Sequence, residues 1–244
     1  TNYGYGVRII DAAITIKDLR KVYRVGNEKV VALDSVSLTI PVGEICAILG
    51  TSGSGKSTLL NLMAGLEKPT RGSIIISQYP IHKMDEKQLA HFRQLKVGFI
   101  FQSYHLLASY TALENVMLPL VFRGIPRNER EQAARRMLEA VGLKTHMHHK
   151  PTQLSGGQQQ RVGIARAFVS KPPVVFADEP TGNLDSRTSE EIMQLILGMA
   201  RQYNQTLVIV THDINVARYA DRIVHILDGN IERIENNLPV EDFV

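Results

Sequence analysis

The sequence has little cysteine: a single residue, Cys46, among 244. One cysteine excludes an intramolecular disulfide framework and suits a reducing cytoplasm. Cys46 lies within an apolar segment, where we expect a small buried hydrophobic side chain rather than a reactive thiol. The sequence also lacks an apolar run near the roughly 20 residues that span a bilayer, and its N-terminus shows no signal-peptide pattern. If the protein acts at a membrane, we expect another chain to supply the membrane-spanning part.

An excess of charge is absent as well. The 28 basic and 24 acidic residues leave a net charge of +4, and the basic residues form no tract. Nucleic acid is therefore not an expected partner. Hydrophobic residues make up 44% of the chain and charged residues 21%, as in an ordinary globular domain with a sizeable core.

The most informative segment is present at residues 50–58, which fit the pattern G-x-x-x-x-G-K-[ST]. An apolar segment precedes it and a helical apolar pattern follows, so we expect strand, glycine-rich turn and helix. In that setting backbone N–H groups and the helix N-terminus cradle a polyphosphate. Lys56 would reach the β- and γ-phosphates, and the Ser57 hydroxyl would ligate Mg²⁺. The phosphate-binding residues predicted in this phosphate loop are Gly50, Ser52, Gly53, Ser54, Gly55, Lys56, Ser57 and Thr58.

Two carboxylates, Asp178 and Glu179, end the apolar segment at residues 174–177. Open α/β sheets bind ligands at the carboxyl ends of their strands, so we expect these acids to lie near the phosphate loop. Asp178 suits a Mg²⁺-holding role, usually through water. Glu179 suits a general base that orients and activates an attacking water.

A second anion site is predicted at residues 154–161, Leu-Ser-Gly-Gly-Gln-Gln-Gln-Arg. Ser155 is a good helix N-cap, and Gly156 and Gly157 allow a close backbone approach at the start of that helix. The chain thus carries two phosphate-binding turns. By contrast, His146, His148 and His149 lack the spacing of a tetrahedral metal site, so we expect a solvated loop there.

The distribution of strand and helix patterns predicts the fold class. Alternating or β-prone segments at 14–19, 30–33 and 36–40 indicate an N-terminal antiparallel sheet. Residues 110–150 carry helical patterns only, including a helix with Asn128 as N-cap and Glu131 three residues later. Elsewhere strands alternate with helices, and the last two strands pair across an Asp-Gly turn. We therefore predict an α/β P-loop NTPase fold with a mostly parallel core sheet, an N-terminal antiparallel β subdomain and an inserted α-helical subdomain.

We expect a single domain across residues 1–244. The core and its antiparallel subdomain would take up about residues 14–100 and 157–234, and the helical subdomain about residues 103–156. Residues 1–12 and 235–244 are expected to be tails.

Taken in order, these motifs resemble the ATP-binding subunits of ABC transporters, and the resemblance covers residues 14–234. It implies that Tyr23 stacks on adenine, that Gln102 contacts Mg²⁺ or the lytic water, and that His212 is a switch at the γ-phosphate. It further implies a signature at residues 154–158 and a loop that communicates across a dimer at residues 183–185. The implied catalytic residues are Glu179, His212 and Gln102, the implied metal-site residues are Ser57, Gln102 and Asp178, and the further nucleotide-binding residues are Tyr23, Ser155, Gly156, Gly157, Gln158 and Asp185.

The resemblance also implies cofactors and partners. ATP and Mg²⁺ would be held between one subunit's phosphate loop and the other's signature, in a head-to-tail dimer with a second copy or a related ATPase. Hydrolysis would drive a separate integral membrane permease, which places the protein peripherally at the cytoplasmic face of the inner membrane.

Three segments, at residues 98–107, 111–120 and 177–186, look like the lipoprotein-releasing and macrolide-exporting branch of this family. That likeness implies an exporter or extruder of lipoprotein, lipid, peptide or drug type. An alternative is a non-transport ABC ATPase that regulates a membrane partner, such as a cell-wall hydrolase system in division. The motor residues are the same in both, so the sequence leaves this alternative open.

Overall fold

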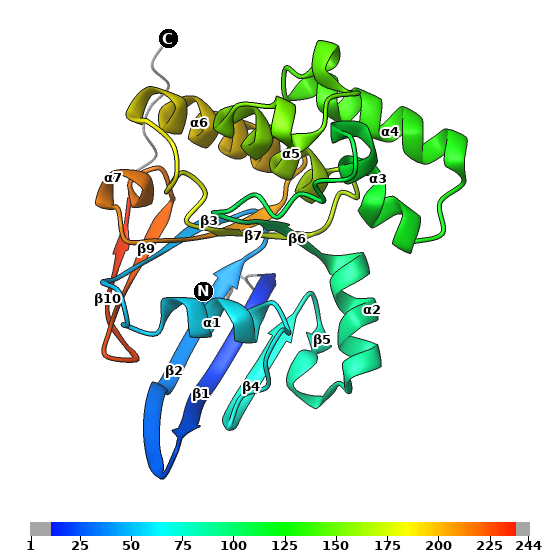
Figure 1. The fold of residues 1–244 in the computed structure, drawn as a ribbon. Helices are drawn as coiled ribbons and strands as arrows, with labels where there is room; N and C mark the ends of the chain where they lie inside the picture. The colour runs from blue at the N-terminus through cyan, green and yellow to red at the C-terminus, as the bar shows by residue number, and fades with distance from the viewer. Residues whose placement is uncertain (1–10, 238–244) are drawn as a thin grey trace, which may run out of the picture.

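The structure, a computed structural model, describes residues 11–237 and contains two β-sheets. The sheets and their covering helices form layers, with α1 between the two sheets and a group of helices above the larger one (Figure 1). The parts of the predicted tails at residues 1–10 and 238–244 lie outside the described residues. Within residues 11–237, no helix combines the length and the apolar character that crossing a membrane requires.

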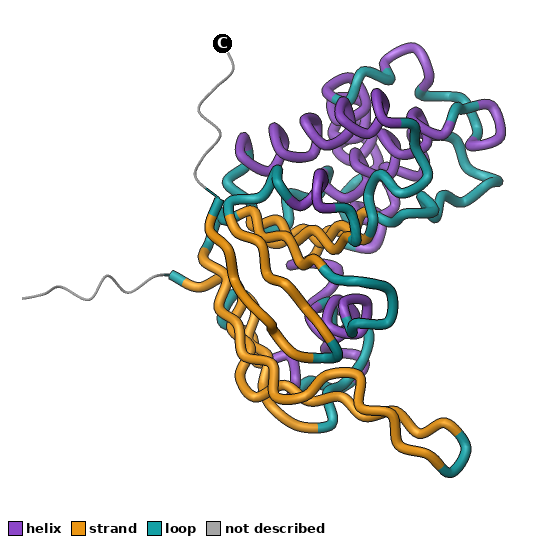
Figure 2. Tube along the Cα trace, turned by 90° about the vertical axis from the view of Figure 1, so that its left-hand side faces the viewer, coloured by secondary structure: helices purple, strands orange, loops and turns teal. Residues whose placement is uncertain are grey.

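The smaller sheet is antiparallel and has the strand order β2-β1-β4-β5. β1 and β2 form a long hairpin that extends away from the helices (Figure 2). The separate strands predicted at 30–33 and 36–40 are wrong, because one continuous strand covers both. Ser35 between them has a φ of +58°, and shifts in the β1–β2 register absorb the irregularity. The strands are β1 (Ala12–Val25), β2 (Glu28–Pro41), β4 (Arg71–Ile76) and β5 (Tyr79–Pro80).

The larger sheet has the order β10-β9-β3-β8-β7-β6, and only β10 runs antiparallel to its neighbour. The prediction of a mostly parallel core sheet is confirmed, as is the C-terminal hairpin. Polar residues at the carboxyl ends of β3, β7 and β8 therefore come to the same edge. The strands are β3 (Ile45–Leu49), β6 (Val97–Ile100), β7 (Val174–Asp178), β8 (Thr206–Thr211), β9 (Arg222–Leu227) and β10 (Asn230–Asn236).

Side chains of the central strands alternate between two hydrophobic cores, because successive residues of a strand point to opposite faces. On β3, Ile45 and Ala47 join the core beneath α3, α4, α5 and α6, whereas Cys46 and Ile48 join the core around α1 and the antiparallel sheet. Cys46 is fully buried, as expected. Both faces of the core sheet are thus covered, which explains why its strands are apolar throughout.

The helices α3 and α4 lie within the predicted helical insertion and pack on each other (Figure 1). Both also pack on α5, which was expected to belong to the core. The helices are α1 (Lys56–Met63), α2 (Glu86–Lys96), α3 (Ala112–Phe122), α4 (Arg127–Ala140), α5 (Gly156–Phe168), α6 (Ser186–Gln202) and α7 (Ile214–Ala217). Short 3₁₀ turns occupy Ile81–Lys83, Lys144–His146 and Pro151–Gln153.

The predicted N-cap at Asn128 is wrong, because α4 already begins at Arg127 and its N-cap position is Pro126. Proline favours a helix start, since its φ is fixed near the helical value and it needs no hydrogen-bond acceptor. Glu131, expected to complete a capping box, instead pairs with Arg135 one turn later, at 2.8 Å. The helix was therefore predicted correctly and its first residue was not.

Candidate functional site

The phosphate loop connects the end of β3 to the start of α1, as the sequence predicts. Gly55 stands at the N-cap of α1 with a φ of +102°, and a Cβ there would lie 2.6 Å from the carbonyl oxygen of Ala32. Only glycine fits this position, on both conformational and steric grounds. The first N–H groups of α1 have no partner within the helix, and their dipole favours an anion. The local structure is therefore suited to phosphate.

Lys56 is the first residue of α1, and its side chain is held inside the loop. Its ammonium donates a hydrogen bond to the carbonyl oxygen of Thr51 at 2.7 Å, and the residue is 7% exposed. Burial lowers the pKa of Lys56, while the charges of Glu179 and Asp178 act in the opposite direction. A desolvated ammonium beside open backbone N–H groups is a strong partner for a polyphosphate.

Glu179 follows the end of β7 and is fixed by two residues from the end of β8. Its Oε1 lies 2.7 Å from His212 Nδ1, and its Oε2 accepts a hydrogen bond from Thr211 Oγ1 at 3.0 Å. Because a carboxylate only accepts, Nδ1 of His212 is the protonated ring nitrogen in this pair. Glu179 has a φ of +43°, an uncommon conformation for a residue with a side chain and one that clusters at functional sites.

Asp178 lies beside Glu179, and their closeness affects its charge. Burial raises the pKa of Asp178, and the neighbouring charge of Glu179 raises it further, while Lys56 and His105 lower it. A divalent cation would relieve this cost, and the oxygen donors of Asp178 and Ser57 are of the kind that Mg²⁺ prefers. The residues therefore fit a magnesium ion that also binds phosphate oxygens.

An open cavity of about 670 Å³, large enough for a nucleotide, is lined by phosphate-loop residues together with Glu179 and His212, whereas Asp178 is not part of its lining. A second cavity of about 430 Å³ adjoins it and shares Glu179 and His212. Of the predicted residues, the phosphate loop, Glu179 and His212 are thus brought together. The first cavity is lined by Leu49, Gly50, Thr51, Ser52, Gly53, Lys56, Ser57, Glu179, His212 and Ile214.

Gln102 and Tyr23 do not line the first cavity. The main-chain carbonyl of Gln102 accepts a hydrogen bond from Asn183 at 3.0 Å, and its side chain lies against Gly182. The hydroxyl of Tyr23 donates to Glu67 at 2.7 Å. Burial and the contact with Glu67 raise the pKa of Tyr23, whereas the Thr58 hydroxyl in α1 acts in the opposite direction. Tyr23 therefore lies near the end of the phosphate loop, whereas the Gln102 side chain lies against the loop that follows Glu179.

The signature turn, residues 155–158, starts α5 and lies away from the phosphate loop. Ser155 and Gln158 form a reciprocal capping box, with N–H···O distances of 2.9 and 3.3 Å. A Cβ on Gly157 would lie 2.9 Å from Thr188 of α6, so the starts of α5 and α6 are neighbours. Asp185 caps α6 through Thr188, which lowers its pKa. None of the signature-turn residues lines the phosphate-loop cavity.

Some residues at the site were not predicted from sequence. Thr211 fixes Glu179, and its place at the end of an apolar strand directly before His212 was an available signal. Gln160 is fully buried, and its amide donates to the carbonyl of Pro180, the residue after Glu179. Gln160 lies within the predicted motif at residues 154–161, but no local pattern predicts its contact with Pro180, which is 20 positions further along the chain. The histidines at 146 and 149 approach each other, with ring centroids 5.1 Å apart.

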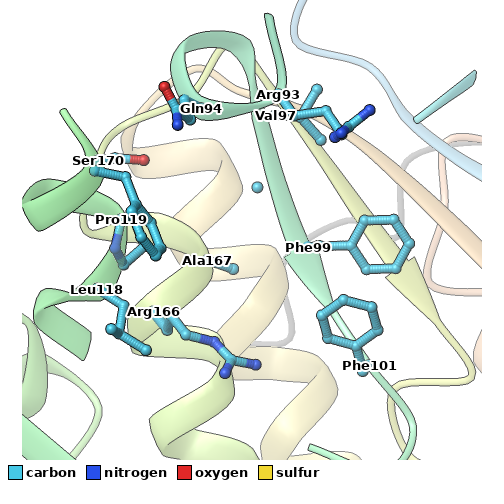
Figure 3. A pocket seen from close by; sticks show the side chains of 12 residues that line it. Arg93, Gln94, Val97, Phe99, Phe101, Leu118, Pro119, Arg166, Ala167 and Ser170 are labelled. Carbon is cyan, nitrogen blue, oxygen red and sulfur yellow. The ribbon is translucent and has the colours of Figure 1, made fainter. Parts of the chain in front are cut away.

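A groove of about 290 Å³ lies on the molecule between α2, β6, α3 and α5 (Figure 3). Its wall is mostly apolar, and the guanidinium groups of Arg93 and Arg166 add positive charge. Arg123, at the end of α3, joins the surrounding elements by donating to the carbonyls of Gln94, Leu95 and Ser170. The apolar side chains of the wall come from Val97, Phe99, Phe101, Leu118, Pro119 and Phe122.

Comparison with known proteins identifies the family to which the sequence is similar. The ABC transporter family pattern matches residues 33–182. The lipoprotein-releasing system ATP-binding protein LolD of Legionella pneumophila is 47% identical over 221 residues, which cover 91% of this chain and 97% of that protein. The macrolide export ATP-binding/permease protein MacB of Vibrio parahaemolyticus is 45% identical over 221 residues, which cover 91% of this chain and 34% of that protein.

Among solved structures, a dimer of the ATP-binding cassette MJ0796 in a post-hydrolysis state, bound to ADP and Pi, superimposes with a TM-score of 0.86. Its sequence is 45% identical to this chain, and the match covers 92% of this chain and 99% of that one. The relative itself comes from Methanocaldococcus jannaschii.

The electrostatics of Asp178 lead to a stability prediction for the ligand-free protein. Since its folded-state pKa is raised, ionised Asp178 costs stability above that pKa, and the cost disappears as the pH falls and the carboxyl takes up a proton. Asp178→Asn should therefore raise the Tm at pH 7, and the difference from wild type should shrink towards about pH 4. Asp34→Asn, in an exposed ion pair, is the control and should leave the Tm almost unchanged. A Tm for Asp178→Asn at or below wild type at pH 7 would refute this assignment.

Proposed function

The chain belongs to the ABC transporter family of ATPases, and from that premise we propose that two copies close around two ATP molecules to drive a separate membrane permease. The observation that carries this proposal is the incompleteness of the site in one chain. The phosphate loop, Glu179 and His212 meet at one cavity, while the signature turn lies elsewhere. A second subunit would bring its signature turn to the open side of that cavity.

The near side of the site would act on the phosphates through charge and position. The Lys56 ammonium would exchange its contact with the Thr51 carbonyl for the β- and γ-phosphates. Ser57 and Asp178 would hold Mg²⁺, with Gln102 close to the same position. Bound there, Mg²⁺ supplies positive charge to the phosphate oxygens. Tyr23 would stack on the adenine after its ring turns from its present contacts.

The hydrolytic step would depend on the orientation of Glu179. His212 and Thr211 each hold one oxygen of that carboxylate, which leaves its remaining lone pairs to accept a hydrogen bond from the attacking water. His212 is 66% exposed on its side chain, so it can also reach the γ-phosphate. The partner's Ser155 hydroxyl and Gly157 N–H would close the other face of that phosphate.

The comparisons support a dimer and a membrane partner. The MJ0796 cassette forms a dimer in its complex with ADP and Pi, and the name of MacB joins an ATP-binding part to a permease. We propose that the groove between α2, β6, α3 and α5 receives the permease, because it is apolar and open. By likeness to LolD and MacB, the cargo would be lipoprotein, lipid, peptide or drug, and the site of action the cytoplasmic face of the inner membrane.

Glu179→Gln tests the catalytic assignment. The amide keeps the shape of the side chain but cannot serve as a base, so kcat should fall by roughly 10²–10⁴-fold while ATP binding persists and closed dimers accumulate. Single-turnover hydrolysis and sedimentation velocity with Mg-ATP measure the two effects. Glu190→Gln, the same change at a carboxylate in the adjoining cavity, is the matched control and should stay near wild type. Turnover near normal in Glu179→Gln would rule out Glu179 as the base.

Affinity isolation from membranes tests the permease partner. The wild-type chain should recover an integral membrane protein, identified by mass spectrometry, and Phe122→Asp in the groove should lose it without loss of ATPase activity of the isolated chain. Phe122 is 64% exposed, so its replacement spares the core. Ile234→Asp, at an exposed site on β10, is the control and should retain the partner. If Phe122→Asp recovers the same membrane protein as wild type, the groove is not the docking site. A recovered permease that moves no substrate would favour the regulatory alternative.

A further inference from the structure

The segment that follows Gln102 contains two adjacent residues in an unfavourable backbone conformation. Tyr104 and His105 have φ angles of +61° and +46°. Left-handed backbone is disfavoured for residues with a Cβ, and two such residues in a row need support from their surroundings. The support must come from contacts with the rest of the fold.

Arg166 of α5 supplies that support. One arm of its guanidinium donates to the carbonyl oxygen of Tyr104 at 2.7 Å and the other to that of His105 at 2.6 Å. Burial lowers the pKa of Arg166 to about 10, and the cation also lies 6.0 Å from the ring centroid of Phe101. The planar fork thus holds both strained residues at once, which a lysine cannot do.

The side chain of Tyr104 reaches the signature turn. A Cβ built on Gly156 would lie 2.9 Å from the Tyr104 hydroxyl oxygen, while a methyl carbon of Leu184 at 3.6 Å and the Tyr104 ring carbon Cζ at 3.9 Å are in ordinary contact. The Tyr104 carbonyl lies near Gly163, two turns further along α5. Burial raises the pKa of Tyr104, in keeping with a ring packed along the helix. Gly156 therefore leaves the space that the tyrosine occupies.

Arg166 also connects the Tyr104 backbone to the groove between α2, β6, α3 and α5. Arg166 and Phe101 are part of its wall (Figure 3). One continuous path therefore leads from the groove wall through Arg166 to the backbone of Tyr104, and through the tyrosine ring to Gly156.

We propose that Tyr104, held by Arg166, is a positioning residue that sets the signature turn against the Gln102 loop. This inference rests on the proposed function, in which the signature turn closes on a partner's ATP. A change at the groove wall that moves Arg166 would release the strained loop and withdraw the ring from Gly156. Tyr104 does not line the phosphate-loop cavity, so its effect should appear in dimer closure rather than in ATP binding to one subunit.

The first test measures ATP-dependent dimerisation by sedimentation velocity in the Glu179→Gln background. Adding Tyr104→Ala should raise the ATP concentration for half-maximal dimer roughly five-fold or more, whereas Tyr104→Phe should stay within about two-fold. The affinity of the monomer for a fluorescent ATP analogue should be the same in Glu179→Gln alone and in its combinations with Tyr104→Ala and Tyr104→Phe. Tyr110→Ala, a tyrosine in the same loop that is 40% exposed, is the matched control and should change nothing.

Two double variants test the contacts themselves. Gly156→Ala should impair dimerisation by clash with the Tyr104 hydroxyl, and Tyr104→Phe in the same chain should restore much of the loss, because the atom in the way is gone. Arg166→Lys should also raise the ATP concentration needed for dimerisation. Combined with Tyr104→Ala it should raise it no further, because both changes act on the same contact between the Gln102 loop and the signature turn.

The outcomes separate this inference from the function on which it rests. If the Glu179→Gln protein forms no dimer with ATP, the proposed function fails. If it dimerises and Tyr104→Ala leaves the ATP requirement unchanged, Tyr104 does not position the signature turn. If Gly156→Ala impairs dimerisation equally with and without Tyr104→Phe, the inference is likewise overturned. It is also overturned if Tyr104→Ala weakens ATP binding to the monomer enough to account for its whole effect on dimerisation.

Discussion

The parallel pairing of β3, β7 and β8 is the constraint on which the site depends. β8 lies between the other two, and the register places Leu49 opposite Thr211 and Asp178 opposite Val210. Three segments far apart in the sequence, the phosphate loop, the acidic pair and the Thr211-His212 pair, therefore end at one edge. The apolar interior of these strands fixes that register from both faces, because a slip of one residue would exchange the two cores. Packing thus determines where the chemistry occurs.

Two carboxylates, Asp178 and Glu179, lie side by side at the carboxyl edge of the core sheet, and their repulsion affects the stability of the ligand-free chain. Asp178 and Glu179 stand together beside a largely buried Lys56, an arrangement that costs stability in the ligand-free chain. A divalent cation beside Asp178 and phosphates beside Lys56 would offset that cost. The signature turn stands apart on the helical layer, with its capping box already formed. In the proposed dimer, the phosphate loop and the signature turn of one chain would contribute to two different ATP sites.

Much of this could be predicted from the sequence, and the gaps have physical causes. The phosphate loop, the acids and the signature turn are local patterns, since each needs only a strand end or a helix start. The predicted start of α4 was wrong because Pro126 and Asn128, only two residues apart, both favour a helix N-terminus, and the helix begins after the proline. Thr211, Gln160, Tyr104 and Arg166 were missed because their partners lie 20 or more positions away along the chain and no periodicity links them. The sequence predicted the helices and strands, but it could not predict the side-chain contacts between them.

In the proposed dimer, ATP binds between the phosphate loop of one subunit and the signature turn of another. The most direct test mixes two variants, Ser52→Cys and Gln158→Cys, each in the Glu179→Gln background, and treats them with a short bis-maleimide. Native Cys46 should not interfere, because it is fully buried and its thiol pKa is raised to about 12. The account predicts a cross-link between unlike variants that depends on Mg-ATP, and little between two copies of Ser52→Cys. Cross-links that form without ATP, or only between like variants, would contradict it.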